Sequence, residues 1–305
     1  NLFIDYGVSN YNDIWGYVDE NGIEYALIGA WDGTYIINIT NSPASVVAFI
    51  PGSYSTHRDI KTYEHYMYIG TEANLPDPSI FEDGITYIEP QGVQVVDLSN
   101  PENPVLVNEW EGVVQSHNIM EADGYLYVIG STSAYSDDGS ELSWGIDDLI
   151  ILDLADPSAP EKVGGWSEEY FHDVCISGDI LYGCGIYSHT MWAMDISDKT
   201  NPQVITSWDG IPSSHACWVS DDGNTLFTAS ETSGGHIMSW DVSDLSNINL
   251  LDQWMPPDGE TWSAHNIFVK NNLLYISYYV YGLQILDISA PANLERVGYF
   301  DTVDK

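Results

Sequence analysis

Short apolar and aromatic runs alternate with turn-forming residues along the whole chain. Two of these runs, 125–128 and 274–276, follow the segments 122–124 (ADG) and 270–272 (KNN). Gly, Asn and Asp supply the positive φ angles that tight hairpins require. The segment 100–104, rich in Pro and Asn, is a strand-breaking turn of another kind. No amphipathic helical period of useful length accompanies these runs. The pattern predicts an all-β chain made of short antiparallel strands.

An apolar run with a central Asp or Asn recurs six times, and its central residues lie 42 to 59 positions apart. They are Asn38, Asp97, Asp153, Asp195, Asp241 and Asp287. Ser or Thr usually follows, and then come a turn and a further apolar run such as 105–107. A carboxylate or amide just before a turn accepts hydrogen bonds from nearby backbone N–H groups. We therefore interpret these six residues as structural.

A second motif precedes each of these runs and begins with histidine in five of six cases. Its first residues are Asn12, His57, His117, His172, His215 and His265. Each motif opens a unit of four expected strands, and units of about 40–60 residues that repeat in this way define a β-propeller. The sequence predicts a six-bladed β-propeller of four-stranded antiparallel blades, as a single domain over residues 1–305.

Several segments resemble known repeat families. The run VDLS at 96–99 with the turn NPENP at 100–104 resembles the LVIVD repeat. The segments YNDIWGY at 11–17, HNIFVK at 265–270 and YGLQILD at 281–287 resemble those of choice-of-anchor B family proteins. The resemblance covers nearly the whole chain. It implies a secreted or surface-anchored bacterial or archaeal propeller, and it brings no settled biochemical activity with it.

The charge balance restricts the partners. The chain has 46 Asp plus Glu against 7 Lys plus Arg, and its net charge is −39. This excludes a nucleic-acid binder with a basic surface and argues against docking on anionic lipid. It suits a secreted protein of a halophilic or marine setting, or one that binds calcium. No transmembrane run is visible, so no direct membrane insertion is expected. We expect an extracellular or cell-surface protein, with Asn1 opening a mature or trimmed chain.

The cysteines do not form a disulfide framework. There are three, Cys175, Cys184 and Cys217, so at most one bridge forms within the chain. The sequence does not establish which of them pair.

The histidine motif is the main candidate site. In a propeller each blade begins beside the central axis, so the six motif residues are predicted to lie around one mouth of the channel. Neutral imidazole binds Zn, Cu, Fe or Mn, so His57, His117, His172, His215 and His265 are candidate ligands of a transition metal. The alternative is that each histidine bonds to the backbone of the adjacent blade.

Polar neighbours of the histidines are candidate ligand-binding residues. They are Asn12, Arg58, Asp59, Asn118, Asp173 and Asn266. Their oxygens also suit calcium. Arg58 is assigned one of two roles. It either forms two parallel hydrogen bonds with a ligand carboxylate or sulfate, or it forms an ion pair with Asp that rigidifies the connection into the blade.

Two long insertions, 71–91 and 131–147, are expected on the same face and are typical of binding loops. Their acidic residues include Glu72, Asp137, Asp138 and Asp147. We predict a binding module for an extracellular glycan, protein or small-molecule ligand, acting through its loop-rich channel face. The alternative is a metal-dependent extracellular hydrolase, lyase or oxidase with an axial histidine site. No nucleotide or hydrolase motif assigns catalytic residues, so the sequence leaves the choice between module and enzyme open.

Overall fold

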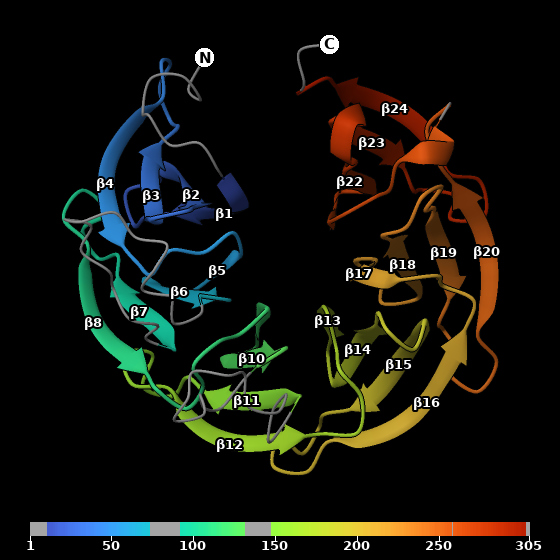
Figure 1. Ribbon diagram of the computed structural model, residues 1–305, viewed down its shortest axis with the longest axis horizontal. Helices are drawn as coiled ribbons and strands as arrows, with labels where there is room; N and C mark the ends of the chain where they lie inside the picture. The colour runs from blue at the N-terminus through green and yellow to red at the C-terminus, as the bar shows by residue number, and fades with distance from the viewer. Residues whose placement is uncertain (1–10, 74–91, 132–147, 258, 303–305) are drawn as a thin grey trace, which may run out of the picture. The chain divides into compact units, whose positions relative to one another are not determined.

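The computed structural model describes residues 11–73, 92–131, 148–257 and 259–302. It contains six four-stranded antiparallel sheets, each made of four consecutive strands (Figure 1). This confirms the six-bladed β-propeller. Helix is limited, among the described residues, to two 3-10 turns, η2 (Gly259–Thr261) and η3 (Tyr279–Tyr281). The chain forms two compact units, Asn1–Ser167 and Glu168–Lys305, with three blades in each.

The first unit contains blades 1 to 3. Blade 1 consists of β1 (Tyr11–Val18), β2 (Glu24–Ala30), β3 (Gly33–Asn38) and β4 (Ser45–Pro51). Blade 2 consists of β5 (Arg58–Tyr63), β6 (Tyr66–Thr71), β7 (Val93–Asp97) and β8 (Val105–Trp110). Blade 3 consists of β9 (Asn118–Ala122), β10 (Tyr125–Ile129), β11 (Leu149–Asp153) and β12 (Glu161–Trp166).

The second unit contains blades 4 to 6. Blade 4 consists of β13 (Val174–Ser177), β14 (Ile180–Gly185), β15 (Thr190–Asp195) and β16 (Gln203–Asp209). Blade 5 consists of β17 (Ser214–Val219), β18 (Thr225–Ser230), β19 (Ile237–Asp241) and β20 (Asn249–Trp254). Blade 6 consists of β21 (Ile267–Lys270), β22 (Leu273–Ser277), β23 (Leu283–Asp287) and β24 (Glu295–Phe300).

The repeated Asp or Asn ends the third strand of every blade. Its side-chain oxygen accepts a hydrogen bond from the backbone N–H two residues further on, at 2.7–3.1 Å. In Asp195, Asp241 and Asp287 the hydrogen bonds of the following serine lower the carboxyl pKa. The structural interpretation of these residues is therefore confirmed.

The cores lie between neighbouring blades of each unit. In the first unit Leu27 and Ile36 of blade 1 pack with Ile60 and Met67 of blade 2. Blades 2 and 3 share a similar cluster, as do blades 4 and 5, and blades 5 and 6. Because each cluster fixes one blade on the next, it also fixes the starts of their first strands, where the histidines lie.

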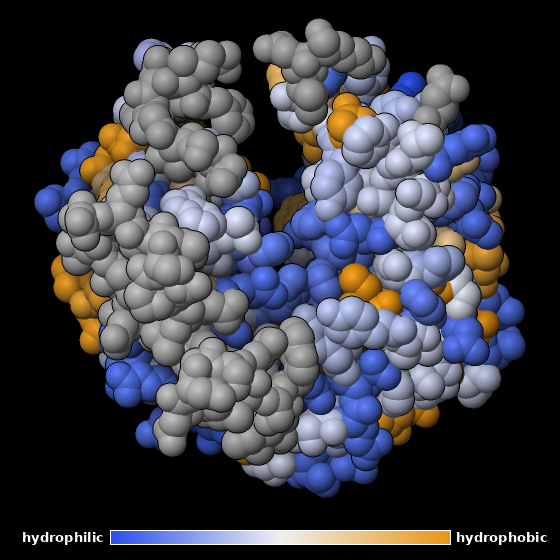
Figure 2. Space-filling model, in the orientation of Figure 1, coloured by the Kyte–Doolittle hydropathy of each residue, from blue (hydrophilic) through white to orange (hydrophobic). Residues whose placement is uncertain are grey.

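The three cysteines are free and buried in the core shared by blades 4 and 5. The Sγ atoms of Cys175 and Cys217 lie 3.0 Å apart. On the face drawn in Figure 2 the described residues of the second unit are predominantly hydrophilic, with hydrophobic ones in scattered patches. Among the described residues, no helix is long and apolar enough to cross a membrane.

Candidate metal centre

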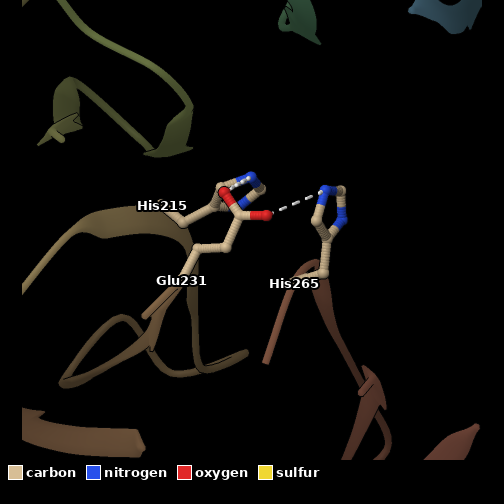
Figure 3. Close-up of side chains that lie close together, drawn as sticks. All are labelled: His215, Glu231 and His265. Carbon is tan, nitrogen blue, oxygen red and sulfur yellow. Dashed lines mark ion pairs between the residues drawn. The ribbon is translucent and has the colours of Figure 1, made fainter. Parts of the chain in front are cut away.

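Two histidines and a glutamate converge in the second unit. His215 lies in β17, Glu231 follows β18 directly, and His265 lies just before β21. The carboxylate of Glu231 is oriented between the two imidazoles (Figure 3). Nε2 of His215 lies 3.4 Å from one of its oxygens, and Nε2 of His265 lies 4.0 Å from the other. The candidate ligand atoms of all three residues lie within 4.8 Å of one another.

A β-bulge determines the direction of His215. Ser214 pairs with Ser230 and Ala216 with Ala229, so His215 is the additional residue between them. Bulges of this kind re-aim a side chain and are common beside functional sites. The His215 side chain is 4% exposed, against 27% for Glu231 and 38% for His265. The cluster is therefore buried at His215 and accessible to solvent at His265.

His172 extends the cluster into blade 4. Its ring lies 4.2 Å from that of His215, whose ring in turn lies 4.3 Å from that of His265. Nδ1 of His172 is 3.2 Å from the carbonyl oxygen of His215. Since a carbonyl only accepts, Nδ1 of His172 is the donor in this contact. The structure thus brings three of the predicted histidines together in this unit.

Tyr279 fixes the carboxylate of Glu231. Its hydroxyl donates a hydrogen bond to Oε1 of Glu231, and its ring packs edge-on against His265 at 5.5 Å. Burial, followed by the bond to Glu231 and its negative charge, raises the pKa of Tyr279, so the hydroxyl keeps its proton at neutral pH. The backbone φ of Tyr279 is 29°. Such values are rare for bulky residues and cluster at functional sites.

The donor set suits a transition metal. Two imidazoles and one carboxylate hold zinc in sites that keep open positions, and also bind non-haem iron. On a tetrahedral ion with bonds of about 2.0–2.1 Å, neighbouring ligand atoms lie about 3.3 Å apart. The 3.4 Å separation between His215 and Glu231 matches this value. Nε2 of His265 lies 4.0 Å from the other oxygen of Glu231, so His265 must move closer to share an ion with His215 and Glu231.

A related cluster lies in the first unit. Nδ1 of His57 is 3.0 Å from one carboxylate oxygen of Glu72, and Nδ1 of His117 is 2.5 Å from the other. The rings of the two histidines lie 5.6 Å apart. Burial raises the pKa of Glu72, but the hydrogen bonds of His117 and His57 lower it more, and the carboxylate stays ionised.

Arg58 and Asp59 have contacts within the first unit. The buried guanidinium of Arg58 donates to the carbonyl oxygens of Ala30 at 3.1 Å and Ser53 at 2.5 Å. Burial lowers the pKa of Arg58 to about 10, although the charge of Asp32 raises it. These bonds tie blade 2 to blade 1, and ligand binding by Arg58 stays a prediction.

Acidic residues also join the first strands of neighbouring blades. Oδ2 of Asp59 accepts from the N–H of Ile119 at 2.7 Å, while Oδ1 contacts Nζ of Lys61 at 2.6 Å. Oδ2 of Asp13 accepts from the N–H of Ile60 in the same way, at 2.9 Å. Asp59 thus has a structural role at the position where the sequence suggested a ligand-binding residue, and its ligand binding stays a prediction.

The other predicted polar residues lie in or just before the first strand of their own blades. Nδ2 of Asn12 donates to the carbonyl oxygen of Thr56 at 3.0 Å. Oδ1 of Asp173 accepts from the N–H of Val174. Asn118 begins β9, where it pairs with Ile129, and the Asn266 N–H bonds to Oγ of Ser277. Ligand binding by these four stays a prediction, and Asp137, Asp138 and Asp147 of the second insertion lie outside the described residues.

Sequence reasoning missed Glu231 and Tyr279, and it noted Glu72 only as an acidic insertion residue. Both glutamates directly follow the second strand of their blade, β6 or β18. A comparison of this position among the six repeats would have placed each glutamate beside the histidine of its own blade. In an antiparallel pair, the residue after the second strand lies next to the start of the first strand.

Comparison of the sequence with known protein families identifies a repeat that fits the propeller fold. Residues 86–111 and 262–302 match the LVIVD repeat, so the chain is a six-bladed β-propeller with LVIVD repeats. A comparison with curated proteins gave no match.

Solved structures share the fold at low identity. A functionally unknown protein from Desulfotomaculum acetoxidans is 13% identical, with a TM-score of 0.62, over 96% of this chain and 86% of its own. A putative 6-phosphogluconolactonase from Bacteroides fragilis is 11% identical, with a TM-score of 0.64, over 95% and 81%. The periplasmic gluconolactonase of Pseudomonas aeruginosa is 13% identical, with a TM-score of 0.59, over 96% and 83%. Such identities show the fold alone.

Proposed function

We propose that this protein is an extracellular binding module that works through a divalent transition-metal ion held by His215, Glu231 and His265. The observation that carries the proposal is the convergence of three donor atoms, from two neighbouring blades, within 4.8 Å of one another. Three protein ligands leave coordination positions for an external molecule. The ligand class is an oxygen donor of a glycan or a small molecule.

The residues around the site have separate tasks in this proposal. The bulge aims His215 at the site, and the rings of His172 and His265, each tilted by 47° relative to the His215 ring, pack against it. The hydroxyl of Tyr279 orients the carboxylate of Glu231. Second-shell contacts of this kind orient metal ligands.

The ion also supplies positive charge that the chain lacks. Only 7 residues are Lys or Arg, against 46 acidic ones, and Arg58 and Lys61 are engaged within the first unit. A bound divalent cation, with two neutral imidazoles and one carboxylate, gives the site a net charge of about +1. An anionic or strongly polar oxygen of a ligand is then attracted to an otherwise acidic molecule.

The second candidate function is metal-dependent hydrolysis. The hydroxyl of Tyr279 lies beside the carboxylate, and its single proton would have to turn from Glu231 to a reacting oxygen in order to stabilise negative charge there. When bound, the ion would polarise a carbonyl and activate water. Two proteins of similar fold are a putative 6-phosphogluconolactonase and a periplasmic gluconolactonase, so sugar lactones are the first substrates to assay.

Isothermal titration calorimetry of untagged protein with Zn²⁺, Mn²⁺ and Ca²⁺ tests the proposal. We expect Zn²⁺ to bind, and His215→Ala, Glu231→Gln and His265→Ala each to remove one binding event. His65→Ala is the matched control, because His65 lies at the turn between β5 and β6 in the first unit. If Zn²⁺ binding by Glu231→Gln equals that of the wild type, the site is not the metal centre.

A further inference from the structure

The two units repeat one constellation of side chains. In each, a histidine lies at the start of the first strand of a blade, a glutamate directly follows the second strand, and a histidine precedes the next blade. The residues are His57, Glu72 and His117 in the first unit and His215, Glu231 and His265 in the second. Glu72 follows His57 by 15 residues, and Glu231 follows His215 by 16.

The geometry of the first cluster suits a shared ion. Glu72 directs one oxygen to each Nδ1, at 3.0 Å from His57 and 2.5 Å from His117. Two imidazoles on one tetrahedral ion, with bonds of about 2.0–2.1 Å, place their ring centres about 5 Å apart. The rings of His57 and His117 lie 5.6 Å apart. Among the described residues only the donors of the second unit all lie within 4.8 Å of one another, so His57 and His117 must move closer together to share an ion with Glu72.

The three side chains of this cluster are partly enclosed. The Glu72 side chain is 31% exposed, His117 is 13% exposed and His57 is 51% exposed. Nε2 of Gln115 donates to the carbonyl oxygen of Glu72 at 2.7 Å, and Oγ1 of Thr56 lies 3.1 Å from Nδ1 of His57. As in the second unit, one histidine is enclosed while the other faces solvent, which leaves a path for the ion.

We propose that His57, Glu72 and His117 form a second divalent transition-metal site, so that each chain binds two ions. The assignment rests on the proposed function for the class of ion, and its ligands are separate from those of the second unit. Each neutral imidazole binds the ion through Nδ1 and carries its proton on Nε2, so binding changes the tautomer and releases no proton. The site is expected to bind at least about tenfold more weakly, because the ion displaces hydrogen bonds to a charged carboxylate.

Elemental analysis and Zn²⁺ calorimetry of untagged protein test this site. We expect two ions per wild-type chain, one in Glu72→Gln, one in Glu231→Gln and none in the double variant, with His65→Ala unchanged. One ion per wild-type chain, unaffected by Glu72→Gln, would overturn the proposal and leave the cluster as a hydrogen-bonded clamp between blades 2 and 3.

The same variants separate this proposal from the first one. Loss of an ion only in Glu231→Gln supports the second unit's site and refutes this one, and loss only in Glu72→Gln does the reverse. Circular dichroism checks that each variant is folded. If Glu72→Gln does not fold, His57→Ala replaces it, because that side chain is half exposed, and it must also lose one ion.

Discussion

Replacing Tyr279 with phenylalanine removes one hydroxyl from the second unit and leaves the aromatic ring in place. That hydroxyl donates to Oε1 of Glu231, while the ring contacts His265 edge-on. The change therefore separates the orientation of the carboxylate from the packing of the histidine. If Glu231 is a metal ligand, its orientation in the free protein affects how tightly the ion binds.

The size of the effect follows from the role of Tyr279. Loss of a hydrogen bond that orients a metal ligand typically lowers metal affinity 10–100-fold, which is about 1.4–2.8 kcal/mol. A second effect of the hydroxyl would change metal affinity in the opposite direction. The hydroxyl competes with the ion for the same carboxylate oxygen, so without a positioning role its removal would leave affinity equal or higher.

Zn²⁺ titration calorimetry of Tyr279→Phe and wild type measures this difference, with thermal unfolding as a check on the fold. Tyr299→Phe is the matched control, because it makes the same chemical change on an exposed residue of β24. We expect Tyr279→Phe to bind 10–100-fold more weakly and Tyr299→Phe to match the wild type. Equal or tighter binding by Tyr279→Phe would refute the positioning role.

Three further predictions concern stability and reactivity. Arg58→Met leaves two buried carbonyls without their donor and should lower the free energy of unfolding by about 2–5 kcal/mol in urea titrations; a loss below about 0.5 kcal/mol would contradict this role. Burial, and then the charge of Asp59, raises the pKa of Asp13 to about 8. Between about pH 4 and pH 8 the unfolded chain thus binds fewer protons at Asp13, so this group makes stability fall as pH rises. Asp13→Asn, which keeps an acceptor for Ile60, should flatten that fall, and an unchanged pH slope would count against the shift. Burial raises the pKa of all three cysteines, so few thiolates form. Ellman's reagent should react slowly with the folded protein. In urea it should react with all three thiols. Rapid reaction of the folded protein would contradict the burial of the cysteines.

The fold was predictable because its signals are local. The Asp or Asn that ends each third strand bonds to a backbone N–H only two residues away, so the sequence alone contains both partners. The hairpin residues Asp123, Asn271 and Asn272 adopt the positive φ angles expected of them. Six repetitions of such local rules specify a six-bladed architecture.

The site was predictable only in part because its contacts are not local. The histidine positions follow from the repeat, but Glu231 has the sequence context of an ordinary loop acid and contacts His265 of the next blade. The bulge that re-aims His215 depends on strand register, which alternation of apolar residues does not specify. Tyr279 bonds to a residue 48 positions away in the chain.

Native mass spectrometry of untagged protein reconstituted with Zn²⁺ counts the ions on each chain and so tests whether His215, Glu231 and His265 hold one. We expect Glu231→Gln to carry one ion fewer than the wild type and His65→Ala to carry the same number. A wild-type chain that carries no Zn²⁺ after reconstitution, or an unchanged count in Glu231→Gln, would contradict that expectation.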